Sequence, residues 1–112
     1  MINESVLEKC YEAYEIEKII DVVVSFKSSH ESRRVRIEAL RDLRDNKYST
    51  TAYILENITV QPTYPQYNVN GKYDRSPNDM EVWSHYDLPW TNGNSADAVL
   101  TQALVFLRER CE

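Results

Sequence analysis

The chain has 112 residues, of which 42% are hydrophobic and 28% charged, and its formal net charge is −5. This length suits a single domain spanning residues 1–112, and the composition is that of a folded protein rather than a disordered one. No stretch approaches the roughly 18 apolar residues that cross a bilayer. The chain starts without an apolar signal core, so we expect a cytoplasmic protein with no membrane contact. With only two glycines, the sequence argues against a glycine-rich phosphate-binding loop.

The first expected element is a helix from about Asn3 to Glu15. Asn3 can cap its start, and apolar residues then recur at helical spacing. These residues are Val6, Leu7, Cys10, Ala13 and Tyr14.

Two strands are expected next. Residues 20–26 are rich in β-branched side chains that alternate, and residues 34–39 alternate apolar and charged side chains. A polar turn at residues 27–32 separates them. The competing interpretation is helical, because residues 16–27 and 32–44 also fit a 3.6-residue period.

A third strand is expected at residues 48–55, after a turn at Asp45-Asn46-Lys47. Residues 33–56 should therefore form a hairpin, whose second strand can extend through residues 58–60 until Pro62. Asn70-Gly71, between Tyr67 and Tyr73, favours a type I′ hairpin turn. Residues 81–88 alternate like a strand, after a single turn at residues 76–79.

The last expected element is a helix capped by Ser95. Asp97 lies in its first turn, and a continuous apolar stripe runs along one face. The stripe consists of Ala96, Val99, Leu100, Ala103, Leu104 and Leu107. The sequence thus predicts an α+β fold: one antiparallel sheet of three to four strands, with the N-terminal and C-terminal helices on one face. The other face would carry Arg34, Arg36, Glu38 and one set of tyrosines and threonines.

Aromatic residues are concentrated between Pro62 and Trp90, in a segment with few aliphatic residues. Tyrosine and tryptophan dominate binding hot spots because they bury a large rigid area at little entropic cost. We therefore expect a non-catalytic protein-binding module, such as an adaptor, inhibitor, regulator or chaperone. Its partner-binding residues would be Tyr64, Tyr67, Tyr73, Trp90, Arg34 and Arg36. The competing interpretation is that these rings pack against the protein's own core.

Basic residues are concentrated at residues 33–47, in the segment from Arg33 to Lys47. The alternative function is a nucleic-acid-associated protein that uses this segment, since arginines beside tyrosines on a sheet can bind phosphates and stack on bases. Three acids interleave the segment and the whole chain is acidic, which does not favour nucleic acid as the partner.

Catalytic chemistry has one candidate constellation, His85 and Asp87, which share a strand face with Trp83. Neighbouring Ser84 points the other way, so we expect no enzyme. No histidines or cysteines have metal-ligand spacing, and we expect neither metal nor cofactor. An unpaired sheet edge beside exposed aromatic residues favours a homodimer.

Overall fold

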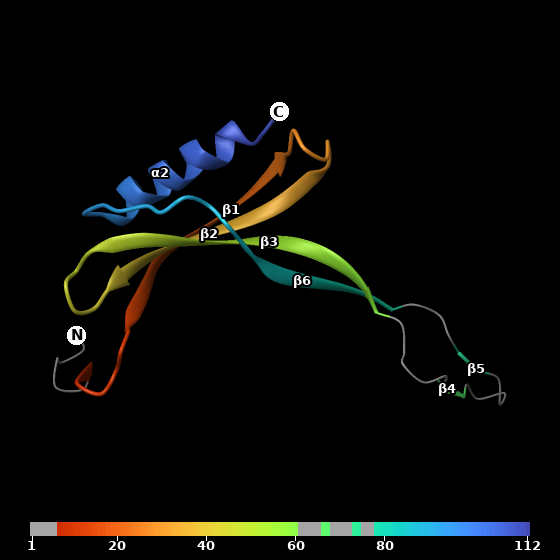
Figure 1. The fold of residues 1–112 in the computed structure, drawn as a ribbon, viewed down its shortest axis with the longest axis horizontal. Coiled ribbons are helices and arrows are strands. Elements are labelled where there is room, and N and C mark those ends of the chain that lie inside the picture. Colours follow the sequence, from red (N-terminus) through yellow and green to blue (C-terminus); the bar gives the residue numbers. More distant parts are fainter. Residues whose placement is uncertain (1–6, 61–65, 68–72, 75–77) are drawn as a thin grey trace.

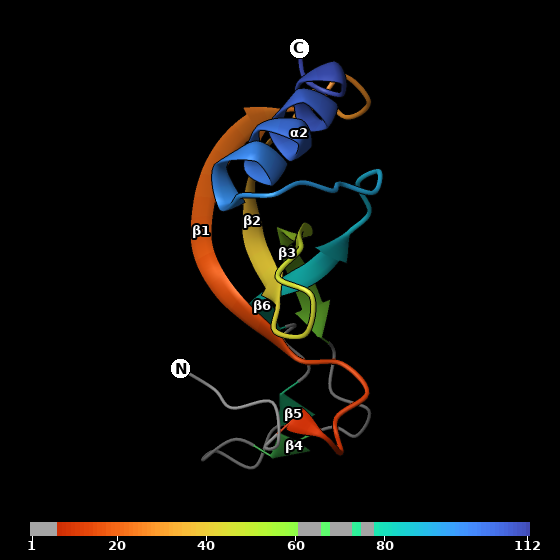
Figure 2. The ribbon, with the colours of Figure 1, turned by 90° about the vertical axis from the view of Figure 1, so that its left-hand side faces the viewer.

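The structure is a computed structural model, and it describes residues 7–60, 66–67, 73–74 and 78–112. Four strands form one antiparallel sheet in the order β1-β2-β3-β6. One helix, α2, follows the last strand and lies on one side of this sheet (Figures 1 and 2). The sheet strands are β1 (Tyr14–Ser25), β2 (Ser32–Asp42), β3 (Tyr48–Val60) and β6 (Asn78–Tyr86), and α2 spans Ala96–Glu109.

The strand interpretations of residues 34–39 and 48–55 are confirmed. Those of residues 20–26 and 81–88 are confirmed up to Ser25 and Tyr86, where β1 and β6 end. The helical alternatives for residues 16–27 and 32–44 are wrong. Strands β2 and β3 form the expected hairpin, in which Val35 pairs with Ile54 and Arg41 with Tyr48. Asn46 adopts a positive φ of 59° in the turn, which asparagine tolerates better than most residues. In this region, the alternation of apolar and polar side chains was therefore the correct predictor of secondary structure, and the 3.6-residue period was not.

A short second sheet lies beyond the far end of β3 and β6, away from α2 (Figure 1). Its strands are β4 (Gln66–Tyr67) and β5 (Tyr73–Asp74), and Tyr67 pairs with Tyr73. This antiparallel pair is the one expected around Asn70-Gly71, whose own turn lies outside the described residues. The turn expected at residues 76–79 is wrong for Asn78 and Asp79, which already belong to β6, and its first two residues lie outside the described ones.

The predicted N-terminal helix is wrong over the residues that the structure describes. Only Leu7 is helical among residues 7–15, and the chain is already in strand β1 at Tyr14. Cys10 and Tyr14, two members of the expected apolar stripe, are exposed, so the stripe has no surface on which to be buried. Pairing of Tyr14 with Asp42 and of Ile16 with Leu40 gives this backbone partners in the sheet instead.

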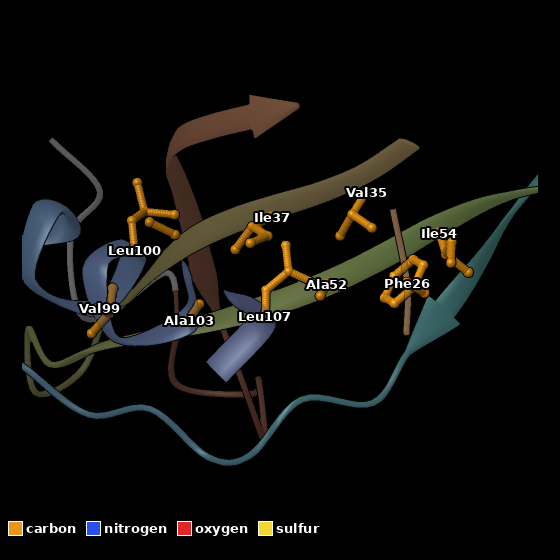
Figure 3. Packing of buried hydrophobic residues seen from close by; sticks show 10 residues of the cluster. Phe26, Val35, Ile37, Ala52, Ile54, Val99, Leu100, Ala103 and Leu107 are labelled. Carbon is orange, nitrogen blue, oxygen red and sulfur yellow. The ribbon is translucent and has the colours of Figure 1, made fainter. Parts of the chain in front are cut away.

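The hydrophobic core lies between α2 and the sheet, mainly over β2 and β3 (Figure 3). Alternate residues of β2, namely Val35, Ile37 and Ala39, are completely buried beneath the helix. The helix contributes the expected stripe, of which Val99, Leu100, Ala103 and Leu107 are buried. Phe26, Ala52 and Ile54 complete the buried cluster. Of the two faces of the sheet, one is covered by α2, and the described residues place no such cover on the other.

The helix boundary agrees with the sequence in detail. Ser95 is the N-cap, and its side-chain oxygen accepts a hydrogen bond from the Ala98 N–H at 3.1 Å. Asp97 lies in the first turn and Arg108 in the last, where each favours the helix dipole. Among the described residues, no helix is long and apolar enough to span a bilayer.

Candidate functional site

The sheet face opposite α2, which we call the open face, carries the candidate site. Cross-strand partners in a sheet point to the same side, so the register assigns its residues. On β1 and β2 they include Ile16, Ile19, Asp21, Val23, Arg34, Arg36, Glu38 and Leu40. On β3 and β6 they are Ser49, Thr51, Tyr53, Leu55, Asn57, Glu81, Trp83 and His85. The expected arginines, tyrosine and threonine therefore do lie on the face away from the helix.

One row of partners crosses all four strands at the centre of the open face. Asp21 pairs with Arg36, Arg36 with Tyr53, and Tyr53 with His85. Each of these four side chains has hydrogen-bonding groups, and two of them are aromatic. The row is thus a continuous polar and aromatic strip, running from one edge strand to the other.

Arg36 is held in place within this strip by two neighbours. Its Nε donates to Oδ1 of Asp21 at 2.9 Å, and its Nη2 donates to Oδ2 at 3.3 Å. Its guanidinium carbon also lies 4.4 Å from the ring centroid of Trp83, within range of a cation–π interaction. Hydrogen bonds from Arg36 lower the pKa of Asp21, and the same contact raises the pKa of Arg36. The guanidinium is therefore already oriented, which reduces the entropy that it loses when it binds a partner.

The other end of the strip holds the histidine of the catalytic hypothesis. His85 meets the ring of Tyr53 edge to face, with centroids 6.3 Å apart. Ser84 lies on the opposite face, as expected from its position in the strand, and donates a hydrogen bond to Glu56 at 3.0 Å. Asp87 comes after the last residue of β6. The geometry thus places His85 among the aromatic groups of the open face rather than beside Ser84.

Apolar side chains on edge strand β1 flank the strip. Ile16, Ile19 and Val23 point from β1 to the open face, and they are 50%, 51% and 66% exposed. Branched aliphatic side chains exposed side by side on a strand are typical of a surface that contacts another molecule.

A cavity of about 400 Å³ opens beside the aromatic end of the strip. Its lining includes His85, Asp87, Trp90 and Thr50, and the Trp90 side chain is 81% exposed. The cavity forms where residues 87–92 leave β3 before the chain returns to it at Gly93, whose carbonyl accepts a hydrogen bond from the Tyr48 N–H at 3.1 Å.

Where residues 87–92 leave β3, no backbone group among the described residues forms a hydrogen bond with the backbone of Thr50 on that side of the strand. Backbone groups alternate in direction along a strand, so the N–H and C=O of Thr50 point to the same side as the N–H of Tyr48. The cavity therefore combines an exposed indole with an unpaired backbone donor and acceptor. Its size lies within the range of small-ligand and peptide-anchor pockets.

The predicted partner-binding residues are only partly brought together. Arg34 is exposed and Arg36 half-buried, both on the open face, and Trp90 lies at the adjoining cavity. Tyr67 and Tyr73 are paired positions of β4 and β5, at the other end of β3 and β6. Tyr64 lies outside the described residues.

Three of the six basic residues in segment 33–47, namely Arg33, Arg36 and Arg41, form ion pairs within the described residues. Arg33 lies 3.7 Å from Glu56, and Arg41 pairs with both Glu15 and Glu17. Arg44 donates instead to the backbone carbonyl of Leu7 at 3.3 Å. Side chains held in this way have less capacity to neutralise the phosphates of a nucleic acid.

Sequence reasoning missed Asp21 and Tyr53 as members of the site. For Asp21 the sequence did contain a signal. A hairpin turn at residues 27–32 brings Asp21 opposite one of the alternating charged residues of β2. Charge complementarity favours Arg36 over Glu38 as its partner. Comparisons with protein-family models, with curated proteins and with solved structures gave no match.

Proposed function

We propose that this protein is a non-catalytic protein-binding module, of the adaptor, inhibitor or chaperone kind, which contacts its partner through the open face. The observation that carries the proposal is the Arg36–Trp83 stack at the centre of a sheet face that α2 leaves uncovered. Arginine and tryptophan are the residue types most enriched in binding hot spots. The fixed orientation of Arg36 suits it for an acidic or carbonyl-bearing group of a partner.

The apolar row on β1 and the cavity at Trp90 extend this surface on either side of the stack. Burial of Ile16, Ile19 and Val23 would supply apolar area, and Trp90 would supply an aromatic anchor. The unpaired backbone groups of Thr50 suit an extended segment of the partner, since such a segment presents a matching donor and acceptor. The aromatic loop with Tyr64, Tyr67 and Tyr73 remains part of the proposal on sequence grounds.

Affinity capture from the native host's lysate tests the proposal. Wild type is compared with a double variant, Arg36→Ala with Trp90→Ala, and with a control, Arg108→Ala, which changes an exposed arginine on α2. We expect at least one captured protein that is kept by the control and lost by the double variant. With that protein purified, the double variant should raise the Kd by about 10-fold or more. Thermal melting confirms that all three proteins are folded.

Two outcomes would contradict the proposal. Equal capture by wild type and the double variant would show that the captured proteins do not bind through the open face. A set of captured proteins that disappears after nuclease treatment would favour the nucleic-acid alternative at residues 33–47. A second double variant, Tyr64→Ala with Tyr67→Ala, tests the aromatic loop separately.

A further inference from the structure

In the part of the chain that the structure describes, strand β1 forms an edge of the sheet and pairs only with β2. Its segment Ile19 to Val24 contains five aliphatic residues and one charge, Asp21. Edge strands that are apolar and extended are usually protected by charges, bulges or a partner, because they can otherwise pair with another chain. Among the described residues, such protection is found at the two ends of β1 and not between them.

At one end, the last residues of the chain already occupy the edge. Phe26 and Cys111 form an antiparallel bridge, and the Glu112 N–H donates to the Ser25 carbonyl at 2.8 Å. At the other end, a bulge between Ile16 and Lys18 interrupts the strand. Bulges twist an edge and end its pairing. The edge is therefore open from Lys18 to Val24, and Asp21 is the middle of this window.

The direction of the backbone groups follows from the contact with the chain end. The carbonyl of Ser25 points outward to Glu112, and the N–H of Lys27 points outward to Arg110 at 3.0 Å. Because directions alternate, the backbone groups of Ile19, Asp21 and Val23 also point outward. Within the described residues, no backbone partner meets these outward groups.

We propose that two copies of this chain pair antiparallel through β1, about a two-fold axis at Asp21. This register pairs Ile19 of one copy with Val23 of the other and forms about six hydrogen bonds between the chains. An axis at Ile20 or Val22 would form only about four, because one of the outward residues would then meet the bulge or the chain end. The resulting eight-stranded sheet joins the two open faces.

A two-fold contact requires the same surface on both copies to be complementary. The side chains of residues 18–24 meet this requirement when two copies pair antiparallel. On the open face, Ile19 of one copy lies beside Val23 of the other, and each is more than half exposed in the single chain. The contact buries their facing sides, while their outer surfaces stay on the joined open face. On the helix face, Ile20 packs beside Val22 of the second copy and lengthens the edge of the core. The two copies of Asp21 face each other as like charges, which alone is unfavourable. Each carboxylate is held by its own Arg36, so the four charges at the axis sum to zero.

Sedimentation velocity tests the interface across the micromolar concentration range, where wild type should be a dimer. Val23→Pro should raise the dimer Kd by about 100-fold or more. A proline there removes only an outward N–H, which edge strands tolerate, so the monomer should keep its circular dichroism spectrum. Val23→Lys, which puts a charge opposite Ile19, should also give a monomer and replaces the proline variant if that does not fold. Val105→Lys makes the same substitution at an exposed position of α2 and should leave the dimer intact.

Cross-linking tests the register, in a background where Cys10 and Cys111 are replaced by serine. Directly opposed residues of a hydrogen-bonded pair have Cα atoms about 5.5 Å apart, which suits a disulfide. Asp21→Cys should therefore form a covalent dimer on mild oxidation. Val23→Cys should not, because its two copies would lie roughly 14 Å apart along the strands.

Three outcomes overturn the proposal. The first is a wild-type monomer at every concentration. The second is a dimer that both Val23→Pro and Val23→Lys leave unchanged. The third is cross-linking through Val23→Cys without cross-linking through Asp21→Cys.

Discussion

The two faces of the sheet are built from the same strands, yet they differ in almost every physical respect. On the face beneath α2, Val35, Ile37 and Ala39 of β2 have no exposed surface. On the open face, the intervening residues of β2 include two arginines and a glutamate, and neighbouring aliphatic side chains of β1 are half exposed or more. Adjacent residues of one strand therefore meet entirely different surroundings.

This difference separates the residues that hold the fold from those available for contact. Burial beneath the helix removes apolar area from water, and this is the main stabilising contribution in a domain of this size. The open face contributes less to stability, because its apolar groups stay hydrated and its ion pairs are exposed. Substitutions on the two faces should therefore have effects of very different size.

The largest expected effect is the loss of a buried isoleucine. Ile37→Ala removes a fully buried side chain beneath α2 and should lower the free energy of unfolding by about 2–5 kcal/mol. Ile16→Ala makes the same change on the open face, where the side chain is 50% exposed. It should cost less than about 1 kcal/mol, because half of that side chain is hydrated already. Urea denaturation followed by circular dichroism measures both, and equal losses would contradict the distinction between the faces.

A smaller effect is expected at the start of the helix that covers the buried face. Ser95→Ala removes the hydrogen bond to the Ala98 N–H and should cost about 1 kcal/mol. Asn94→Ala, at the exposed neighbouring position, should change stability by less than about 0.5 kcal/mol. The same denaturation experiment compares the two variants. If Ser95→Ala lowered the free energy of unfolding no more than Asn94→Ala, the capping hydrogen bond would contribute nothing to the stability of α2.

The difference between the faces also explains which parts of the fold were predictable. Alternation at Val35, Ile37 and Ala39 identified a half-buried strand and its buried side, and the stripe from Ala96 to Leu107 identified the helix. These patterns record burial directly. The prediction of an N-terminal helix was wrong for a different reason. Apolar residues at helical spacing around Cys10 stabilise a helix only if another surface of the protein is available to pack against them, and the sequence alone does not show whether such a surface exists.

The candidate site was less predictable for a related reason. Arg34 and Arg36 could be assigned to the open face from their position in a strand. The contacts of Arg36 with Asp21 and Trp83 depend on the registers of separate strand pairs, β1 with β2 and β3 with β6. A one-residue change in either register would move these side chains to the other face. The cavity at Trp90 depends on the departure of residues 87–92 from β3, which no local pattern records.

The smallest expected effect concerns the ion pair at the centre of the open face. Because hydrogen bonds from Arg36 lower the pKa of Asp21 in the folded state, the pair stabilises the fold when this carboxylate is charged. Its contribution is fully present above the unfolded pKa of about 3.9, and it is lost as the pH falls through the lower folded-state pKa. Asp21→Asn removes the charge at every pH. The stability difference between wild type and Asp21→Asn should therefore be constant near neutral pH and shrink below about pH 4. Urea denaturation at a series of pH values measures it, with both proteins carrying Val23→Pro, which prevents dimer formation without adding a charge beside Asp21. A difference that stays constant down to the lowest pH would mean that the charge of Asp21 adds nothing to stability, and that Arg36 is oriented by Trp83 alone.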